Sequence, residues 1–429
     1  MAVAGTNMHT MTDPGCERCG RCLSVCPVYR EKRIETFSPR GRLDLIRGVD
    51  AGEFTPGDRY GTVVHSCLQC LACFDACPKG VNAAGMIRAE KTRLVQQTGG
   101  TVIRLEALGL KLALGNRSIF ARTAAVLNAL SGRFKKRRNA VAPSRHLPLF
   151  LLDALAGKQI PDLHRDHRAD RLPSIIDPPA GKTPRGEVIL FTGCFFGYLD
   201  TRPLAAAIRA LMHNAVRIHI PSAQVCCGAP AALSGHPGIL AKNSRINLKA
   251  FGDDLPVVTL CATCGSTLKH DYQALFQTDA IHDRRARTLP ERVVDLDEYL
   301  SGLTGFRPGP VPIHQHVTIH QPCHLNRGMS AGGSIRALLE KLPGLGITTL
   351  EGEAECCGGG GLCAVKNPDL SRSLGSRKAG RITDTGADLI AAPCPGCLLQ
   401  IRDRLSALDS GIKPVHPAEL VARTYGYPL

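Results

Sequence analysis

Residues 188–194 read Val-Ile-Leu-Phe-Thr-Gly-Cys, and residues 317–323 read Val-Thr-Ile-His-Gln-Pro-Cys. Each stretch is a short apolar run that ends in a cysteine, and the segments that follow the two stretches correspond as well. In both copies, short apolar runs alternate with helical patterns of about 10–15 residues, which predicts βαβ units on a parallel sheet. This part of the chain is therefore an internal repeat of an α/β unit.

The predicted elements occupy corresponding places in the two copies. We expect the cysteines of the repeat to lie at the carboxyl ends of the strands, where open α/β sheets bind their ligands. The first copy has predicted strands at 188–191, 216–220 and 257–260 and predicted helices at 205–213 and 236–251. The second copy has predicted strands at 317–320, 347–350 and 389–392 and predicted helices at 335–342 and 368–382.

Each copy contributes five cysteines in the same order: a single cysteine, an adjacent pair followed by Gly228 or Gly358, and a C-x2-C pair. Adjacent side chains diverge, so such a pair is poorly placed to share one zinc ion but can bind two irons of a larger cluster. The glycine would let the backbone pass close to a bulky inorganic core. Buried free thiols can explain a single cysteine, but not ten at repeated spacing. The candidate ligands are Cys194, Cys226, Cys227, Cys261 and Cys264, and Cys323, Cys356, Cys357, Cys394 and Cys397.

Two further cysteine runs lie near the start of the chain, at residues 16–26 and 67–77. Both match C-x2-C-x2-C-x3-C-P, the pattern that ligates cubane [4Fe–4S] clusters, in which the fourth cysteine of each run binds the other cluster. Structural zinc sites also use C-x2-C pairs, but two complete runs that end in proline fit iron–sulfur better. The expected ligands are Cys16, Cys19, Cys22 and Cys77 for one cluster, and Cys67, Cys70, Cys73 and Cys26 for the other.

The composition is that of a soluble globular protein. Of 429 residues, 44% are hydrophobic and 21% are charged, which excludes a disordered or collagenous chain. Of the 19 cysteines, the sets above leave Cys363, which we interpret as a packing thiol rather than a ligand. No stretch approaches the ~18 consecutive apolar residues of a spanning helix, and the first residues do not resemble a secretory signal. We therefore expect a cytoplasmic protein whose thiols stay reduced and can bind metal.

The formal net charge is +16, and +13 of it belongs to residues 1–186. The most basic run is Arg133–Arg138, which has no accompanying recognition module and few aromatic residues, so we expect no nucleic-acid partner. Two interpretations of this run stay open. One is a surface that faces anionic lipid headgroups on the inner face of the membrane or an acidic partner subunit, and the other is a solvated loop. The Pro-rich stretch 161–186 is typical of a linker.

The CCG repeat behind two ferredoxin runs resembles the iron–sulfur subunit of glycolate oxidase and of D-lactate dehydrogenases. The same layout occurs in the C subunit of anaerobic glycerol-3-phosphate dehydrogenase and in heterodisulfide reductases. Residues 37–43, Phe-Ser-Pro-Arg-Gly-Arg-Leu, resemble a motif of the glycolate and lactate group. The resemblance covers about residues 13–95 and 187–425.

The resemblance implies a multidomain fold of the α+β and α/β classes, in which an N-terminal α-helical ferredoxin module precedes two repeated α/β CCG domains. We expect a two-[4Fe–4S] domain at 1–98, a helical and basic connector at 99–186, and CCG domains at 187–312 and 313–429. The resemblance also implies that each CCG domain holds a non-cubane [4Fe–4S] cluster through five thiolates, beside the two cubanes.

No flavin or nucleotide motif is found in this sequence. No G-x-G-x-x-G opens a strand–helix unit, and Gly181-Lys182-Thr183 fails as a phosphate loop because Ile176 stands where glycine is needed. The resemblance therefore implies an electron-transfer subunit of an oxidoreductase complex. An FAD-containing partner would oxidise glycolate or D-lactate, and this chain would pass electrons to a quinone or other carrier. The alternative is a thiol/disulfide oxidoreductase of the heterodisulfide reductase type, with catalytic CCG clusters.

Two pairs of polar residues have open roles. His320 and His324 flank Cys323 and can tune a cluster through hydrogen bonds to sulfur, or they are ordinary histidines of a strand end and a loop. Arg40 and Arg42 line the cubane clusters or a partner interface, or they belong to a solvated basic loop.

Overall fold

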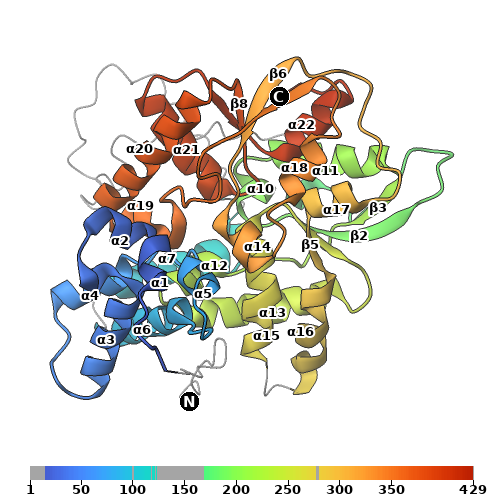
Figure 1. Ribbon diagram of the computed structural model, residues 1–429. Coiled ribbons are helices and arrows are strands. Elements are labelled where there is room, and N and C mark those ends of the chain that lie inside the picture. The colour runs from blue at the N-terminus through green and yellow to red at the C-terminus, as the bar shows by residue number, and fades with distance from the viewer. Residues whose placement is uncertain are drawn as a thin grey trace, which may run out of the picture.

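The computed structural model describes residues 15–98, 101–116, 118–120, 122, 169–276 and 280–428. A helical N-terminal part lies against two sheet units, the first built on strands β1 to β5 and the second on strands β6 to β9 (Figure 1). The basic run 133–138 and residues 161–168 of the expected linker lie outside the described residues.

The N-terminal part is helical wherever it is described as regular structure. Its longest helix follows the second cysteine run and spans Ala83–Thr98. Its core contains Leu43, Tyr60, Val64 and Ile87. The elements are α1 (Arg21–Val25), α2 (Pro27–Lys32), η1 (Glu35–Phe37), α3 (Pro39–Asp50), α4 (Asp58–His65), α5 (Ala72–Asp75), α6 (Ala83–Thr98) and α7 (Thr101–Leu114).

The first turn of α3 is specified by residues 38–41 of the Phe37–Leu43 motif. The Ser38 hydroxyl caps the helix by accepting a hydrogen bond from the Gly41 amide at 3.0 Å, and Pro39 takes the first helical position. Gly41 has no room for a side chain, because an added Cβ would lie 2.1 Å from the Glu35 carbonyl oxygen. The motif is thus a helix start packed against the preceding 3-10 turn.

The first sheet has the strand order β1-β3-β2-β4-β5. The three predicted strands are confirmed, and their pairs β2–β3 and β2–β4 are parallel, as is β4–β5. The strands are β1 (Ile175–Ile176), β2 (Gly186–Phe191), β3 (Val216–His219), β4 (Val257–Thr259) and β5 (Val293–Asp295).

The interpretation of 161–186 as a linker is wrong for the described part of that stretch. It contains η2 (Ala169–Arg171), and β1 pairs antiparallel with β3 at the edge of the first sheet. The Ile220 amide also donates to the Ser174 carbonyl at 2.8 Å. Prolines flank β1 on both sides, and an edge strand tolerates them because one of its sides needs no backbone donors. The sequence also did not predict β5, which is only three residues long.

The second sheet has the order β7-β6-β8-β9, and its pairs are parallel. The strand predicted at 347–350 runs two residues earlier, because residues 345–348 pair with 315–318 of β6 and the chain then leaves the ladder. Leu350 is still buried, which explains why the apolar run looked longer than the strand. The strands are β6 (Gln315–Ile319), β7 (Leu345–Thr348), β8 (Leu389–Ala391) and β9 (Lys413–Val415), the last of which was not predicted.

Helices cover the sheets, and the four helices predicted in the repeat are confirmed to within a few residues. The first unit has α10 (Phe195–Tyr198), α11 (Arg202–His213), α12 (Ala229–Leu233), α13 (Pro237–Phe251), α14 (Ala262–Ser266), the π-helical η3 (Thr267–Asp271), α15 (Tyr272–Leu275), α16 (Ala280–Arg292) and α17 (Leu296–Gly302). The second has the π-helical η4 (His324–Gly328), α18 (Ser334–Leu339), η5 (Gly360–Leu362), α19 (Cys363–Lys366), α20 (Pro368–Asp384), α21 (Pro395–Ala407) and α22 (Pro417–Thr424).

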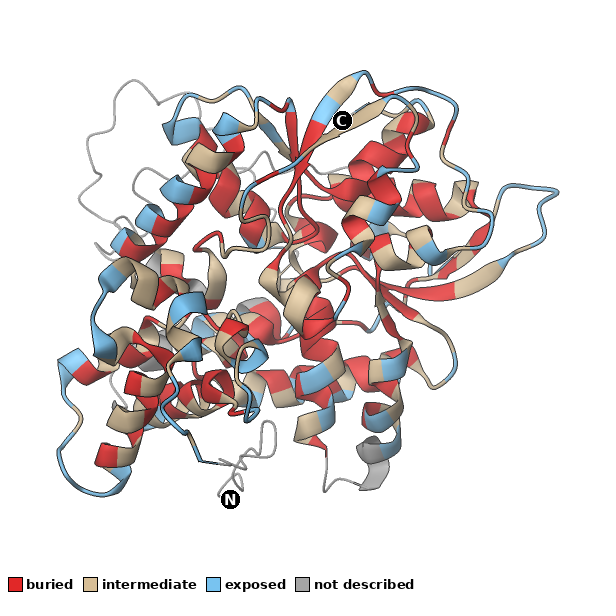
Figure 2. Cartoon of the chain, viewed as in Figure 1, coloured by how far each residue is buried: buried red, intermediate tan, exposed pale blue. Residues whose placement is uncertain are grey.

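The two sheet units share one continuous apolar core. Figure 2 shows buried residues along the strands and on the inner sides of the helices that join the units. Helix α22 of the second unit packs against α11 of the first. At its start, buried His416 contacts the Leu260 carbonyl at the end of β4, with Nε2 and O 2.9 Å apart. This packing brings the carboxyl ends of the two sheets together.

The N-terminal part contacts both units. Arg88 of α6 forms an ion pair with Asp271 of the first unit at 2.9 Å, and both side chains are only 9% exposed. Arg30 of α2 pairs with Glu355 of the second unit at 2.8 Å. Among the described residues, no helix is long and apolar enough to cross a membrane.

Candidate metal centres

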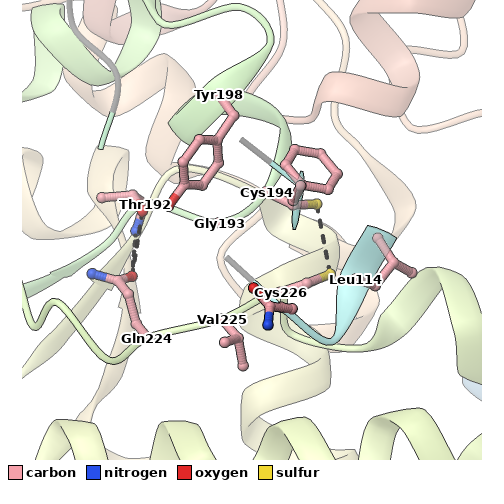
Figure 3. Close-up of a pocket in the computed structure, with 10 residues that line it drawn as sticks. Leu114, Thr192, Gly193, Cys194, Tyr198, Gln224, Val225 and Cys226 are labelled. Atoms are coloured by element: carbon pink, nitrogen blue, oxygen red, sulfur yellow. Dashed lines mark hydrogen bonds between the residues drawn. The ribbon is translucent and has the colours of Figure 1, made fainter. Parts of the chain in front are cut away.

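The cysteines of the first copy form a row of neighbouring sulfurs at the carboxyl ends of the parallel strands. Cys194 follows β2, the pair Cys226 and Cys227 lies between β3 and α12, and Cys261 and Cys264 follow β4. The Sγ atoms of Cys194 and Cys226 are 3.6 Å apart, and a dashed line joins the two residues in Figure 3. The prediction that these cysteines gather at strand ends is confirmed by their positions.

The sulfurs in that row are hydrogen-bonded to one another. Bonds from the Cys226 and Cys264 thiols lower the pKa of Cys227 to about 6. Cys264 is in turn hydrogen-bonded to Cys261. A thiol with a lowered pKa is held as thiolate, which is the form that binds metal.

The second copy repeats this arrangement sulfur for sulfur. Cys323 is hydrogen-bonded to Cys356, Cys356 to Cys357, and Cys357 to Cys397. Bonds from Cys356 and Cys397 lower the pKa of Cys357, just as the pKa of Cys227 is lowered in the first copy. The spacing in the sequence thus reflects two equivalent constellations.

The two rows meet, which the sequence did not predict. The Cys261 thiol is hydrogen-bonded to Cys394 of the second copy. Thr263 Oγ1 also lies 3.7 Å from Cys394 Sγ and 3.0 Å from His324 Nδ1. The ten cysteines of the repeat therefore form one continuous array across the interface between the units.

The glycine after each cysteine pair packs closely against a long helix. Gly358 has φ +85°, and a Cβ there would lie 2.9 Å from Leu374 Cβ and from the Ser371 carbonyl oxygen in α20. Gly228 has φ +90° and is equally close to Leu240 in α13. Each glycine thus lets the backbone pack closely on the next long helix, and the expectation that it also lets the backbone pass close to an inorganic core stays a prediction. The glycine amides also donate to Cys356 and Cys226 sulfur, both at 3.4 Å.

We predict that Gly358→Ala destabilises the protein by about 1–3 kcal/mol, because alanine is strained at positive φ and its Cβ meets α20. Gly380→Ala is the matched control, since Gly380 lies within α20 and a Cβ there has open space. The free energy of unfolding in denaturant checks both variants. Equal stability of the two variants would contradict the steric argument.

The second N-terminal cysteine run surrounds a cavity together with the last cysteine of the first run. Cys26, Cys67, Cys70 and Cys73 line this cavity with apolar neighbours that include Val28 and Ile87. Burial and the nearby Cys323 raise the pKa of Cys70 to about 12. The cavity therefore lies next to the second row of the repeat.

The remaining N-terminal set is nearer the surface. Cys19 is exposed, whereas Cys16, Cys22 and Cys77 are partly buried. Burial raises the pKa of Cys22, and the backbone amide of Arg40 in the first turn of α3 opposes this by bonding to the Cys22 sulfur. The Val81 amide donates to Cys77 Sγ at 3.4 Å. Amide donors of this kind favour the thiolate.

Comparison with known proteins identifies these parts. A cysteine-rich domain model (CCG) matches residues 188–269 and 317–402, and a 4Fe-4S dicluster domain model matches residues 14–81. The probable glycolate oxidase iron–sulfur subunit of Bacillus subtilis is 30% identical over 96% of this chain and 94% of its own length. The chain belongs to this family of CCG-domain iron–sulfur subunits.

Other relatives extend the family. Lactate utilization protein A of Bacillus subtilis is 30% identical over 55% of this chain and 98% of its own. A subunit of the fumarate reductase (CoM/CoB) of Methanothermobacter marburgensis is 26% identical over 96% of this chain and 72% of its own. Among solved structures, a hypothetical protein from Helicobacter pylori covers 91% of this chain and 77% of its own at 12% identity, with a TM-score of 0.36, too low to bear on the fold.

The residues around the cysteines suit the iron–sulfur clusters of this family. Thiolate-bound clusters are anionic, and buried cations lie beside the sites. Lys91 donates to the Cys67 carbonyl at 2.8 Å, and Lys378 donates to the Gly352 carbonyl at 2.7 Å. Burial lowers the pKa of each lysine to about 8. Both ammonium groups would gain stability from an anionic neighbour.

The roles left open for Arg40 and Arg42 are now distinguished. Arg42 is 1% exposed and donates to the Val63 carbonyl at 2.9 Å and to the Ser66 hydroxyl at 2.6 Å, so a solvated loop is wrong for it. It also lines the cavity with Cys26. Arg40 lies at the surface, where its guanidinium binds the Arg18 carbonyl at 2.8 Å between the first two cysteines of the chain.

His324 connects three of the cysteine sets. Its Nε2 lies 3.0 Å from the Gln69 carbonyl in the second cysteine run, and its Nδ1 contacts Thr263 of the first copy. The Gly358–Gly361 run also lies against the second cysteine run, since a Cβ on Gly360 would be 2.6 Å from the Leu68 carbonyl oxygen. Cys363 is 1% exposed, packs near Cys26, and its thiol is 3.7 Å from the Asn367 carbonyl, as suits a packing thiol.

Proposed function

We propose that this protein is the electron-transfer subunit of a flavin-dependent 2-hydroxy-acid dehydrogenase complex that oxidises glycolate or D-lactate. Its FAD-containing partner takes the hydride from the substrate, and this chain passes the electrons to a quinone or another carrier. The similarity to a glycolate oxidase subunit and a lactate utilization protein supports the substrate class.

The ligand sets proposed here follow the cysteine groups. Two cubane [4Fe–4S] clusters would be held by Cys16, Cys19, Cys22 and Cys77, and by Cys67, Cys70, Cys73 and Cys26. Two further non-cubane clusters would be held by Cys194, Cys226, Cys227, Cys261 and Cys264, and by Cys323, Cys356, Cys357, Cys394 and Cys397. Iron–sulfur clusters supply single-electron transfer when bound.

The observation that carries the proposal is the proximity of the cysteine sets to one another. Beside burial, Cys22 raises the pKa of Cys73 and Cys323 raises the pKa of Cys70, and Cys394 bonds to Cys261. The chain's own residues thus place four candidate centres in sequence from the surface set at Cys19 to the pocket at Cys194. Buried apolar neighbours exclude water from the inner sets, and backbone amides stabilise their thiolates.

The pocket beside Cys194 and Cys226 marks the far end of this series. Leu114, Phe120 and Tyr198 line it, together with Thr192 and Gln224 (Figure 3). We propose that electrons leave the chain near this pocket, because Cys194 and Cys226 of the first row line it.

The proposal is tested on protein purified without oxygen. We expect about sixteen irons per chain, from four [4Fe–4S] clusters, and EPR signals that appear with glycolate or D-lactate only when a neighbouring FAD-dependent oxidase is added. About eight irons would reduce the chain to its two cubanes. Zinc without iron would refute the assignment altogether. Disulfide reduction by the isolated chain with reduced viologen would instead favour the heterodisulfide reductase type.

A further inference from the structure

The two rows of the repeat differ in the side chain that follows the central strand of each sheet. Ile189 of β2 pairs with Val257, and Thr318 of β6 pairs with Ile390. Ile189 and Thr318 each lie five residues before the single cysteine of their copy, and Val257 and Ile390 each lie four residues before the C-x2-C pair. The sheet register therefore places His320 of the second copy where the first copy has Phe191. Both side chains are 1% exposed. An imidazole has thus replaced a phenyl ring beside an otherwise equivalent set of sulfurs.

The His320 ring faces the sulfurs of its own row. One of its nitrogens, Cys357 Sγ and Cys397 Sγ all lie within 4.8 Å of one another. In the first copy, Phe191 instead packs edge-to-face on Phe251, with ring centroids 5.6 Å apart. At this position the second copy therefore offers a nitrogen atom that can bind metal, and the first copy offers none.

The hydrogen bonding of the ring determines which nitrogen is available. Nδ1 lies 3.1 Å from the Glu353 carbonyl oxygen, which can only accept, so Nδ1 carries the hydrogen. Nε2 is buried and has no geometrically satisfactory hydrogen-bond partner among the described residues. Lys378 donates to the same carbonyl at 3.2 Å. The neutral ring then has its lone pair on Nε2, directed toward the sulfurs.

We propose that His320 Nε2 is an iron ligand of the second CCG site, which makes that site a mixed sulfur and nitrogen centre while the first stays all-sulfur. The proposal rests on the proposed function, in that the CCG rows must hold iron. The Nδ1–H···O=C bond to Glu353 has the form that orients and strengthens metal-binding histidines. No proton is released when the neutral nitrogen binds.

The test uses the full chain, purified without oxygen and labelled with ¹⁵N-histidine. Pulsed EPR should show one strongly coupled histidine nitrogen, and His320→Phe should abolish that coupling. Phenylalanine is chosen because the first copy accommodates it at the equivalent position. His324→Gln is the matched control, because both ring nitrogens of His324 face oxygens of the protein. It should retain the coupling.

A second variant keeps the test decisive if His320→Phe fails to fold. His320→Ala should lose the coupling and regain it when ¹⁵N-imidazole is added to the unlabelled protein. A full iron count with no directly coupled nitrogen would overturn the ligand proposal and leave the proposed function intact. About eight irons would overturn both, because the rows would then hold no iron.

Discussion

Cys26→Ser should remove the iron held by the second cysteine run, although Cys26 belongs to the first. Its side chain lines one cavity with Cys67, Cys70 and Cys73, and serine is a poor ligand for iron. We expect the loss of about four irons per chain. The relay from the partner to the CCG rows should fail with it, because this cavity is the one that adjoins Cys323. Iron analysis and EPR of the anaerobic protein measure the loss.

Two matched variants define what the Cys26 result means. Cys22→Ser should remove the other, more exposed cluster and give a different EPR change. Cys363→Ser alters an equally buried sulfur that packs in the same apolar cluster as Cys26, and it should keep all iron. If Cys26→Ser and Cys22→Ser gave the same residual spectrum, crosswise ligation would be wrong.

Cys227→Ser and Cys357→Ser should each remove one CCG cluster and leave both cubanes in place. Two neighbouring thiols lower the pKa of each of these sulfurs, which favours the thiolate that binds metal. Each variant should lose about four irons, and the double variant about eight. Metal analysis with EPR of the cubane signals checks the counts.

The same two variants also separate the rows from each other. If His320 binds iron in the second row, Cys357→Ser should abolish the histidine nitrogen coupling and Cys227→Ser should keep it. Retention of all iron in both single variants would show that the cysteine pairs are not ligands. Loss of about eight irons in either single variant would show instead that the rows form one inseparable site, joined at Cys261 and Cys394.

Cysteine spacing by itself determined which residues can bind metal and how they are grouped. These groups are local patterns, and a local pattern can be recognised in the sequence without knowledge of the fold. They are the runs at 16–26 and 67–77 and the repeated pairs at 226–227 and 356–357. The repeat also predicted parallel strands with cysteines at their ends. The three-residue strands β5 and β9 were missed because so short a run has no distinctive periodicity.

Only the tertiary structure decided how the groups meet. The packing of the two units, chiefly of α22 against α11, brings Cys261 and Cys394 together. These cysteines are more than a hundred residues apart in the sequence, so their spacing could not predict this contact. The same holds for the glycines, whose neighbours are helices α13 and α20, and for buried Arg42. His320 shows the difference most clearly. The sequence places it three residues before Cys323, but only the carbonyl of Glu353 determines which ring nitrogen faces the sulfurs.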